Sequence, residues 1–125
     1  MTGISSKKIL IIDDDSRNIF ALKAVLKAKG FDCLTANDAQ TGIKQLAAND
    51  DIGIILLDMM MPEMDGYEAI SVIRQGSYKN IPIISVTAQA MLGDKKKCLD
   101  AGADGYLSKP IDVDELLALI QVHLR

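Results

Sequence analysis

The segment 53–66 places the strongest constraint on the fold, because a short apolar run ends there at a single carboxylate. Ile54–Leu57 are apolar without interruption, Asp58 follows directly, and the turn formers Pro62 and Gly66 come soon after. A short apolar run bounded by turn residues is typical of a strand that is buried on both faces, as in a parallel sheet. Ligands of such sheets bind beyond the carboxyl ends of the strands. Asp58 is therefore a candidate site residue, although an Asp at this place can also serve only the turn.

Four further segments repeat this arrangement, so that a helical segment follows each of five strands. The expected strands are Lys8–Ile12, Phe31–Ala36, Ile54–Leu57, Ile81–Val86 and Gly105–Ser108. The expected helices run from an N-cap at Ser16 to Lys29, from Asn37 or Asp38 through Ala47, from Asp65 to about Arg74, from Met91 to Ala101, and from Asp112 to the end of the chain. This alternation predicts an α/β fold, a doubly wound five-stranded parallel sheet with helices on both faces. Gly42 is expected to weaken the second helix.

Composition and charge narrow the class of protein. With 125 residues, 49% hydrophobic and 25% charged, the chain is expected to form one domain over residues 1–125. The formal net charge of −3 argues against nucleic acid or an anionic membrane as a partner. No apolar run approaches the ~18 residues of a membrane span, and the N-terminus lacks the apolar region of a signal peptide. Cys33 and Cys98 are expected to be free thiols, which fits a cytoplasmic location.

Polar side chains follow four of the five expected strands. Asp13 and Asp14 follow the first strand, Asp58 the third, Thr87 the fourth and Lys109 the fifth. Because the carboxyl ends of parallel strands lie along one edge of a sheet, we expect these side chains to converge. Carboxylates about 4 Å apart repel one another by a few kcal/mol at an effective dielectric of about 20, so the cluster calls for a cation. Oxygen ligands of this kind suit Mg²⁺.

A carboxylate beside a bound metal can attack phosphorus and form an aspartyl phosphate. The metal and Lys109 would neutralise the transferring group, and the Thr87 hydroxyl would hydrogen-bond it. Taken alone, each residue also has a plain structural explanation: a solvated lysine, an ordinary strand threonine, and an acidic entry to a helix. The joint placement of all of them at strand ends favours the phosphoryl-transfer interpretation.

Four motifs then resemble, in order and spacing, those of a known family: Ile11–Asp14, Leu57–Gly66, Val86–Ala88 and Tyr106–Pro110. The chain from Lys8 onward is similar to the receiver domain of two-component response regulators. Its amino-acid sequence is also similar to that of receiver domains attached to hybrid histidine kinases. The resemblance implies the strand order 2-1-3-4-5. It also implies a phosphoacceptor switch in a histidine–aspartate phosphorelay, which catalyses only its own phosphorylation and dephosphorylation.

The resemblance implies a metal-binding role for four residues. Asp58 would accept the phosphoryl group from a phosphohistidine and would also contact Mg²⁺. Asp14 would bind the metal directly, and Asp13 mainly through water. The backbone carbonyl of Met60 would complete the protein ligands.

The remaining implied roles concern the phosphoryl group itself. Lys109, Thr87 and the backbone amides of Met59 and Ala88 are expected to contact it. Tyr106 is the expected aromatic switch partner of Thr87. The Lys109–Pro110 peptide bond is expected to be cis.

The implied partners are proteins. A histidine kinase or histidine phosphotransfer protein would donate the phosphoryl group, and a downstream protein target or a homodimer would read the change. Three alternative functions are compatible with a similar sheet. A haloacid-dehalogenase-like phosphatase would place a second acid two residues after its nucleophile, whereas Met59 and Met60 follow Asp58. A flavodoxin-like flavin carrier is disfavoured by the acidic loop after the first strand, and a pseudo-receiver by the intact set of site residues.

Overall fold

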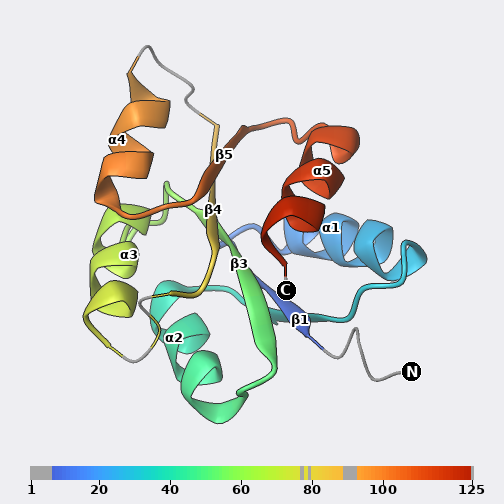
Figure 1. Ribbon diagram of the computed structural model, residues 1–125, viewed down its shortest axis with the longest axis horizontal. Helices are drawn as coiled ribbons and strands as arrows, with labels where there is room; N and C mark the ends of the chain where they lie inside the picture. The colour runs from blue at the N-terminus through green and yellow to red at the C-terminus, as the bar shows by residue number, and fades with distance from the viewer. Residues whose placement is uncertain (1–6, 77, 79, 89–92, 125) are drawn as a thin grey trace.

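The computed structural model describes residues 7–76, 78, 80–88 and 93–124, and within them five strands alternate with five helices (Figure 1). The elements are β1 (Lys8–Ile12), α1 (Ser16–Ala28), β2 (Cys33–Ala36), α2 (Ala39–Ala48), β3 (Ile52–Asp58), α3 (Gly66–Gln75), β4 (Ile83–Thr87), α4 (Asp94–Ala101), β5 (Gly105–Ser108) and α5 (Val113–His123). The number, type and order of the elements agree with the sequence prediction. The predicted start of the fourth helix, at Met91, lies outside the described residues.

The strands form one parallel sheet in the order β2-β1-β3-β4-β5, which confirms the expected topology. The register aligns the carboxyl ends of the central strands: Ile12 pairs with Leu57, Asp58 with Val86, and Thr87 with Ser108. The residues that follow these pairs therefore share one edge of the sheet. This alignment is what brings the polar residues of the sequence prediction together.

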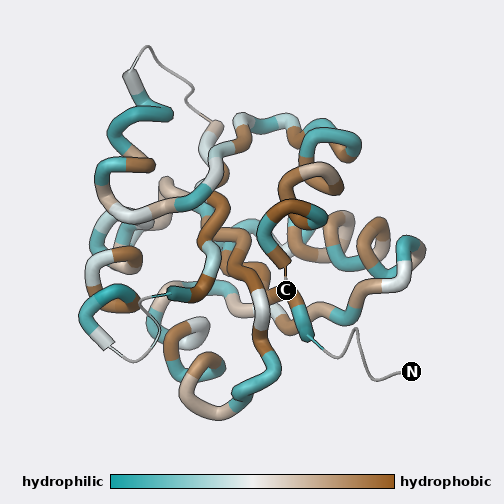
Figure 2. Tube along the Cα trace, viewed as in Figure 1, coloured by the Kyte–Doolittle hydropathy of each residue, from teal (hydrophilic) through white to brown (hydrophobic). Residues whose placement is uncertain are grey.

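Each face of the sheet has its own hydrophobic core. Figure 1 shows α1 and α5 on one face and α2, α3 and α4 on the other. On the first face, α1 and α5 bury a cluster that includes Leu26 and Ile120 against the sheet; on the second, a cluster that includes Leu46 and Ile70 is buried. Figure 2 shows the apolar colouring concentrated along β1 and β3 between these layers. Both faces of β3 are buried, as its uninterrupted apolar sequence predicted.

Helix caps account for several element boundaries. Asp15, not Ser16, is the N-cap of α1: it has extended backbone angles, and its carboxylate accepts a hydrogen bond from the Arg17 amide at 3.0 Å. Asp38, one of the two predicted caps, accepts from the Thr41 amide at 2.7 Å. The predicted caps Asp65 and Asp112 also accept amide hydrogen bonds from the first turns of α3 and α5.

Two strands begin later than predicted, for local reasons. Phe31 donates its amide to the Leu26 carbonyl at 2.9 Å, so it still belongs to the turn that ends α1, and β2 begins at Cys33. Pro82 has no amide hydrogen to give, and β4 begins at Ile83. The Lys109–Pro110 bond is cis, as expected from the family resemblance.

Gly42 has a packing role that the sequence did not reveal. The prediction treated it only as a weak point of α2. In the structure Gly42 is buried, and a Cβ at this position would lie 2.7 Å from Cγ1 of Ile12. Glycine therefore allows α2 to approach β1 closely, which compensates for its poor helix propensity.

Both cysteines are free thiols, as predicted. Burial raises the pKa of the Cys33 thiol to about 11, which keeps it protonated and unreactive at neutral pH. Among the described residues no helix is long and apolar enough to cross a membrane.

Candidate functional site

Three carboxylates meet where β1 and β3 end. Asp13, Asp14 and Asp58 each offer an oxygen atom within 4.8 Å of the others. Asp13 and Asp58 are each 3% exposed, whereas Asp14 is open to solvent. The group thus combines two buried carboxylates with one that an incoming ion can reach first. We refer to it as the acidic pocket.

Asp13 is fixed by two hydrogen bonds from the start of α1. Its Oδ1 accepts from the Asp15 amide at 2.9 Å, and its Oδ2 accepts from Nδ2 of Asn18 at 2.9 Å. Sequence reasoning did not single out Asn18. The available signal was its position five residues after Asp13, in the first turn of the helix that the acidic run introduces.

Lys109 supplies the positive charge of the pocket. Its Nζ lies 3.2 Å from Oδ2 of Asp13 and 3.7 Å from Oδ2 of Asp58. The backbone amide of Lys109 donates to the Thr87 carbonyl at 2.8 Å, which continues the β4–β5 ladder past Ser108 and holds the lysine at the sheet edge. The predicted proximity of Lys109 and Asp58 is therefore present, and Lys109 bridges two carboxylates.

Asp58 is held in an environment that disfavours its charge. Burial, reinforced by the negative charges of Asp13 and Asp14, raises the pKa of the Asp58 carboxyl to about 6. The Met60 amide, which donates to Oδ1 at 3.1 Å, and the nearby Lys109 ammonium both oppose this rise. A cation that neutralised the neighbouring carboxylates would lower this pKa and favour the ionised, nucleophilic form.

The two backbone amides that follow Asp58 make different hydrogen bonds. The Met59 amide donates to the Val86 carbonyl at 2.9 Å, so the sheet already uses the N–H group that was expected to contact the phosphoryl group. The amide that faces the Asp58 carboxylate is that of Met60. The difference arises because β3 keeps pairing with β4 for one residue beyond Asp58.

Thr87, Ala88 and Tyr106 lie on the β4–β5 side of the pocket. Thr87 ends β4 and is buried, and Ala88 follows it at the surface. In the β4–β5 register Thr87 pairs with Ser108 and Ser85 pairs with Tyr106, so Thr87 and Tyr106 are two steps apart on the same face of the sheet. Tyr106 is half-buried against the core that α3 and α4 share.

A cavity of about 160 Å³ lies beside Thr87, between the β3–α3 loop and α4. Its lining includes Met59, Met60, Thr87, Tyr67 and Cys98. The Tyr67 hydroxyl lies 3.7 Å from Sγ of Cys98. The cavity thus adjoins the Thr87 side chain at the end of β4.

The acidic pocket could bind a metal ion, because it offers three carboxylates from a preformed edge of the sheet. The donor set contains oxygen and no sulfur or imidazole, which matches the preference of hard divalent cations such as Mg²⁺. The half-buried Lys109 at its rim adds a second means of neutralising an anion bound there.

A doubly wound sheet in this order, with an acidic pocket at its carboxyl edge, is the architecture of a signalling receiver module rather than of a conventional enzyme. The model of the response regulator receiver domain family matches residues 9–121, and the chain belongs to that family. Its acidic pocket is typical of a phosphoacceptor site.

Curated relatives include parts of larger proteins. The chain is 42% identical over 106 residues to the sensor histidine kinase RcsC of Escherichia coli, covering 85% of this chain and 11% of that protein. It is 38% identical to hybrid signal transduction histidine kinase G of Dictyostelium discoideum, covering 96% of this chain and 4% of that protein. It is 36% identical to the transcriptional regulatory protein HprR of Escherichia coli, covering 94% of this chain and 52% of that protein.

Solved structures show the same fold. A response regulator receiver protein from Pseudomonas putida superposes with a TM-score of 0.87 at 28% identity, covering 93% of this chain and 96% of that one. The chemotaxis protein CheY4 of Vibrio cholerae superposes with a TM-score of 0.86 at 28% identity, covering 94% of this chain and 98% of that one.

Proposed function

We propose that Asp58 is the phosphoacceptor of this receiver domain and takes its phosphoryl group from a phosphohistidine. The observation that carries the proposal is the contact of the Lys109 ammonium with Asp58, within a group of three converging carboxylates. Asp58 is the member of that group that terminates the central strand and has the Met60 amide and Lys109 directed at its two oxygens. Asp13, by contrast, is engaged by the start of α1.

In the proposed transfer, an Asp58 oxygen forms a bond to phosphorus while the phosphorus–nitrogen bond of the phosphohistidine breaks. The electron pair of that bond stays with the imidazole nitrogen of the donor. The Lys109 ammonium neutralises charge on the phosphoryl oxygens, and the Thr87 hydroxyl donates a hydrogen bond to one of them. The amides of Met60 and Ala88 are the proposed backbone donors, with Met60 taking the place first expected for Met59.

Mg²⁺ is the proposed metal of the acidic pocket, held by Asp14, Asp13, Asp58 and the Met60 carbonyl. When bound, it would neutralise the carboxylates and the phosphoryl oxygens. Asp14 is the carboxylate most open to solvent, which suits it to bind the metal directly. Asp13 is buried and already accepts two hydrogen bonds, which suits a contact through water.

Family membership implies a histidine kinase as partner. We further propose that residues 1–125 act as one cytoplasmic receiver domain. A histidine kinase or a histidine phosphotransfer protein would be the donor, and a downstream protein or a second copy of the chain would be the reader. The fold and the relatives that carry receiver regions support this assignment.

Intact-mass analysis after incubation with acetyl phosphate and Mg²⁺ tests the proposal. One added phosphoryl group is expected on the wild-type chain and none on Asp58→Asn. Asp50→Asn, which changes an exposed carboxylate just after α2, is the matched control and should be labelled normally. Phosphorylation that persists in Asp58→Asn at another residue would refute the assignment.

A further inference from the structure

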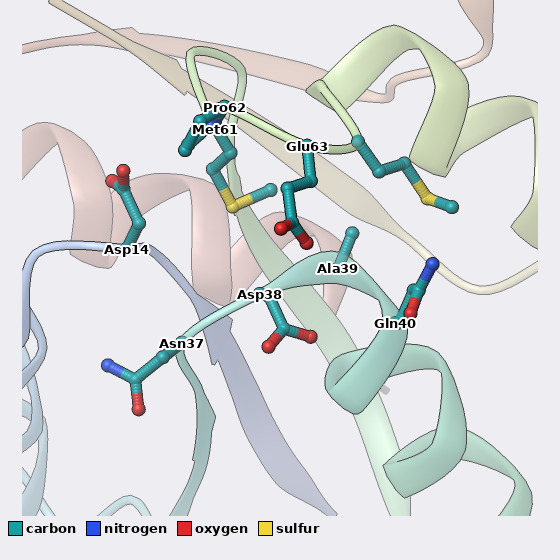
Figure 3. Close-up of a pocket in the computed structure, with 9 residues that line it drawn as sticks. Asp14, Asn37, Asp38, Ala39, Gln40, Met61, Pro62 and Glu63 are labelled. Carbon is teal, nitrogen blue, oxygen red and sulfur yellow. The ribbon is translucent and has the colours of Figure 1, made fainter.

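An apolar groove lies between the β2–α2 and β3–α3 loops, next to the acidic pocket. It has a cavity volume of about 220 Å³, and its lining residues are Asp14, Asn37, Asp38, Ala39, Gln40, Met61, Pro62, Glu63 and Met64. Met61 and Ala39 belong to the buried core and form its apolar floor. Figure 3 shows the Met61 and Glu63 side chains extending from the β3–α3 loop toward the turn at Asp38 and Ala39.

The polar rim of the groove is negative. Asp14, Asp38 and Glu63 line it, and no lysine or arginine is among its described lining residues. Within the described ranges, none of the three carboxylates forms an ion pair, and all three side chains are exposed. Asp38 has a structural task as well, because it caps α2. Glu63 does not cap a helix in this way, and it is therefore the carboxylate best placed to contact a ligand.

The size of the groove limits its occupant. A volume of about 220 Å³ is below the ≈ 300–1,000 Å³ of pockets that hold drug-sized ligands or cofactors, so the groove suits a single large side chain. An apolar floor with an acidic rim matches a side chain with an apolar stem and a cationic head. Arginine fits better than lysine, because its planar guanidinium can hydrogen-bond two carboxylates at once.

We propose that this groove seats an arginine side chain of the protein that docks on the phosphoacceptor edge. The proposal rests on the proposed function, since a protein that presents a phosphohistidine to Asp58 must cover this edge of the sheet. The groove shares Asp14 with the acidic pocket, so a donor seated over the pocket also lies over the groove. Met61 and Pro62 receive the stem of the arginine, and Glu63 and Asp38 receive its guanidinium.

Nuclear magnetic resonance with a short peptide tests this. The probe is acetyl-Ala-Arg-Ala-amide, and the control is the same peptide with neutral citrulline, which has nearly the shape of arginine. The arginine peptide should cause saturable shifts of the Met61 and Met64 methyl signals and of the Ala39 amide. The citrulline peptide should bind at least about threefold more weakly, because the loss of an exposed charge contact lowers the binding affinity by a modest factor.

Two variants with the same chemical change locate the binding. Glu63→Gln should weaken binding of the arginine peptide by about threefold. Glu115→Gln removes an equal charge from the exposed first turn of α5 and should leave binding unchanged. Equal binding of arginine and citrulline, or an unaffected Glu63→Gln variant, would overturn the proposal.

A titration in Mg²⁺ separates the groove from the metal site. Binding to the groove should persist in saturating Mg²⁺, because Glu63 and Asp38 remain available. Shifts that centre on Asp13 and Asp58 and disappear with Mg²⁺ would mean that the peptide merely occupies the acidic pocket, which also overturns the proposal. Acetyl phosphate labelling needs no protein donor, so Glu63→Gln should be labelled at the wild-type rate. Loss of labelling in the wild-type chain would instead count against the phosphoacceptor assignment.

Discussion

At the scale of single residues, the site depends on carboxylates that are held in unfavourable surroundings. Asp58 is buried beside two other acids, and its burial together with their negative charges raises its pKa. Asp13 tolerates burial because the Asp15 amide, Asn18 and Lys109 surround it. The fold thus holds close together carboxylates that would repel one another and move apart in a flexible chain.

Replacing Asp58 by Asn should stabilise the metal-free protein near neutral pH. The folded-state pKa of Asp58, about 6, lies above the ordinary value of 3.8, so the folded protein holds this proton more tightly than the unfolded chain does. Its contribution to stability is therefore present below pH 4 and is lost as the pH rises to 6 and above. The Asn side chain mimics the protonated form at every pH. We expect the free energy of unfolding of Asp58→Asn to exceed that of wild type by roughly 1–3 kcal/mol at pH 7, and by much less at pH 4.

Urea unfolding in EDTA at several pH values between 4 and 7.5 would measure this difference. Asp50→Asn serves as the control: its stability should differ little from that of wild type, and the difference should not follow the titration of Asp58. A stability gain that stays constant across this pH range would contradict the electrostatic explanation.

At the scale of elements, the sequence predicted which segments form strands and helices, but not the contacts that hold their ends together. Periodicity and apolar runs identified every element, because burial of one or two faces dominates those patterns. The polar residues at strand ends identified the acidic pocket for a similar reason, since topology alone makes them converge. Two details could not be predicted: the hydrogen bond from the Met59 amide to the Val86 carbonyl, and the anchoring of Asp13 by Asn18. The first depends on where the β3–β4 hydrogen bonding ends, and the second on the orientation of a side chain in the first turn of α1.

Arg74 is another feature that sequence patterns did not reveal. From the end of α3 its guanidinium donates to the carbonyls of Gly102 at 2.8 Å and Ile81 at 2.6 Å, and to the carboxylate of Asp104 at 2.9 Å. It thus connects α3 with the segments that enter β4 and β5. The prediction had used Arg74 only as a helix end.

Arg74→Met should destabilise the fold by about 2–4 kcal/mol, because several half-buried acceptors lose a charged donor at once. Gln75→Ala is the matched control: its side chain is exposed, and its amide donates a hydrogen bond to Ser71 of its own helix. Thermal and urea unfolding of both variants would provide the comparison. A loss below about 0.5 kcal/mol for Arg74→Met would show that other contacts join these elements.

Substitution of Gly66 tests the geometry of the loop that follows Asp58. A Cβ at Gly66 would lie 2.7 Å from Cα of Met59, which is a backbone atom and cannot rotate away. Gly66→Ala should therefore cost about 1–3 kcal/mol and slow labelling by acetyl phosphate, because the loop that carries Met60 must move. Gly76→Ala is a close control, since the nearest contacts of its Cβ would be at 3.8 Å and 3.9 Å. Equal labelling rates in the two variants would indicate that the loop adjusts without disturbing the site.

At the scale of the whole molecule, we propose that phosphorylation is transmitted as a change of surface. Thr87 and Tyr106 share a face of the sheet, and a cavity lies beside Thr87. A phosphoryl group on Asp58 offers Thr87 a hydrogen bond that does not exist in the resting state, which is the differential contact that a population shift requires. Movement of Thr87 toward it would leave space for Tyr106 to turn inward. The affected face would comprise α4, β5 and α5.

Beryllofluoride with Mg²⁺, a mimic of the phosphoryl group, should shift backbone NMR signals on that face at positions far from Asp58. Thr87→Ala should still bind the mimic, yet lose most of the distant shifts, because the side chain that links Asp58 to Tyr106 is gone. Signals of α2, which lies away from this face, provide the internal control. A full set of distant shifts in Thr87→Ala would show that the coupling follows another route.

The bridging position of Lys109 has a consequence for the order of events. Counted by formal charge, three carboxylates and one ammonium give the pocket a charge of minus two, which is the charge that one divalent ion would balance. Without such an ion, the pocket would repel a dianionic phosphoryl group. A bound divalent ion would remove that repulsion, whereas a monovalent ion would leave part of it in place. If Mg²⁺ binds as proposed, Lys109 would thus impose an order on the reaction, with the metal bound before the phosphoryl donor.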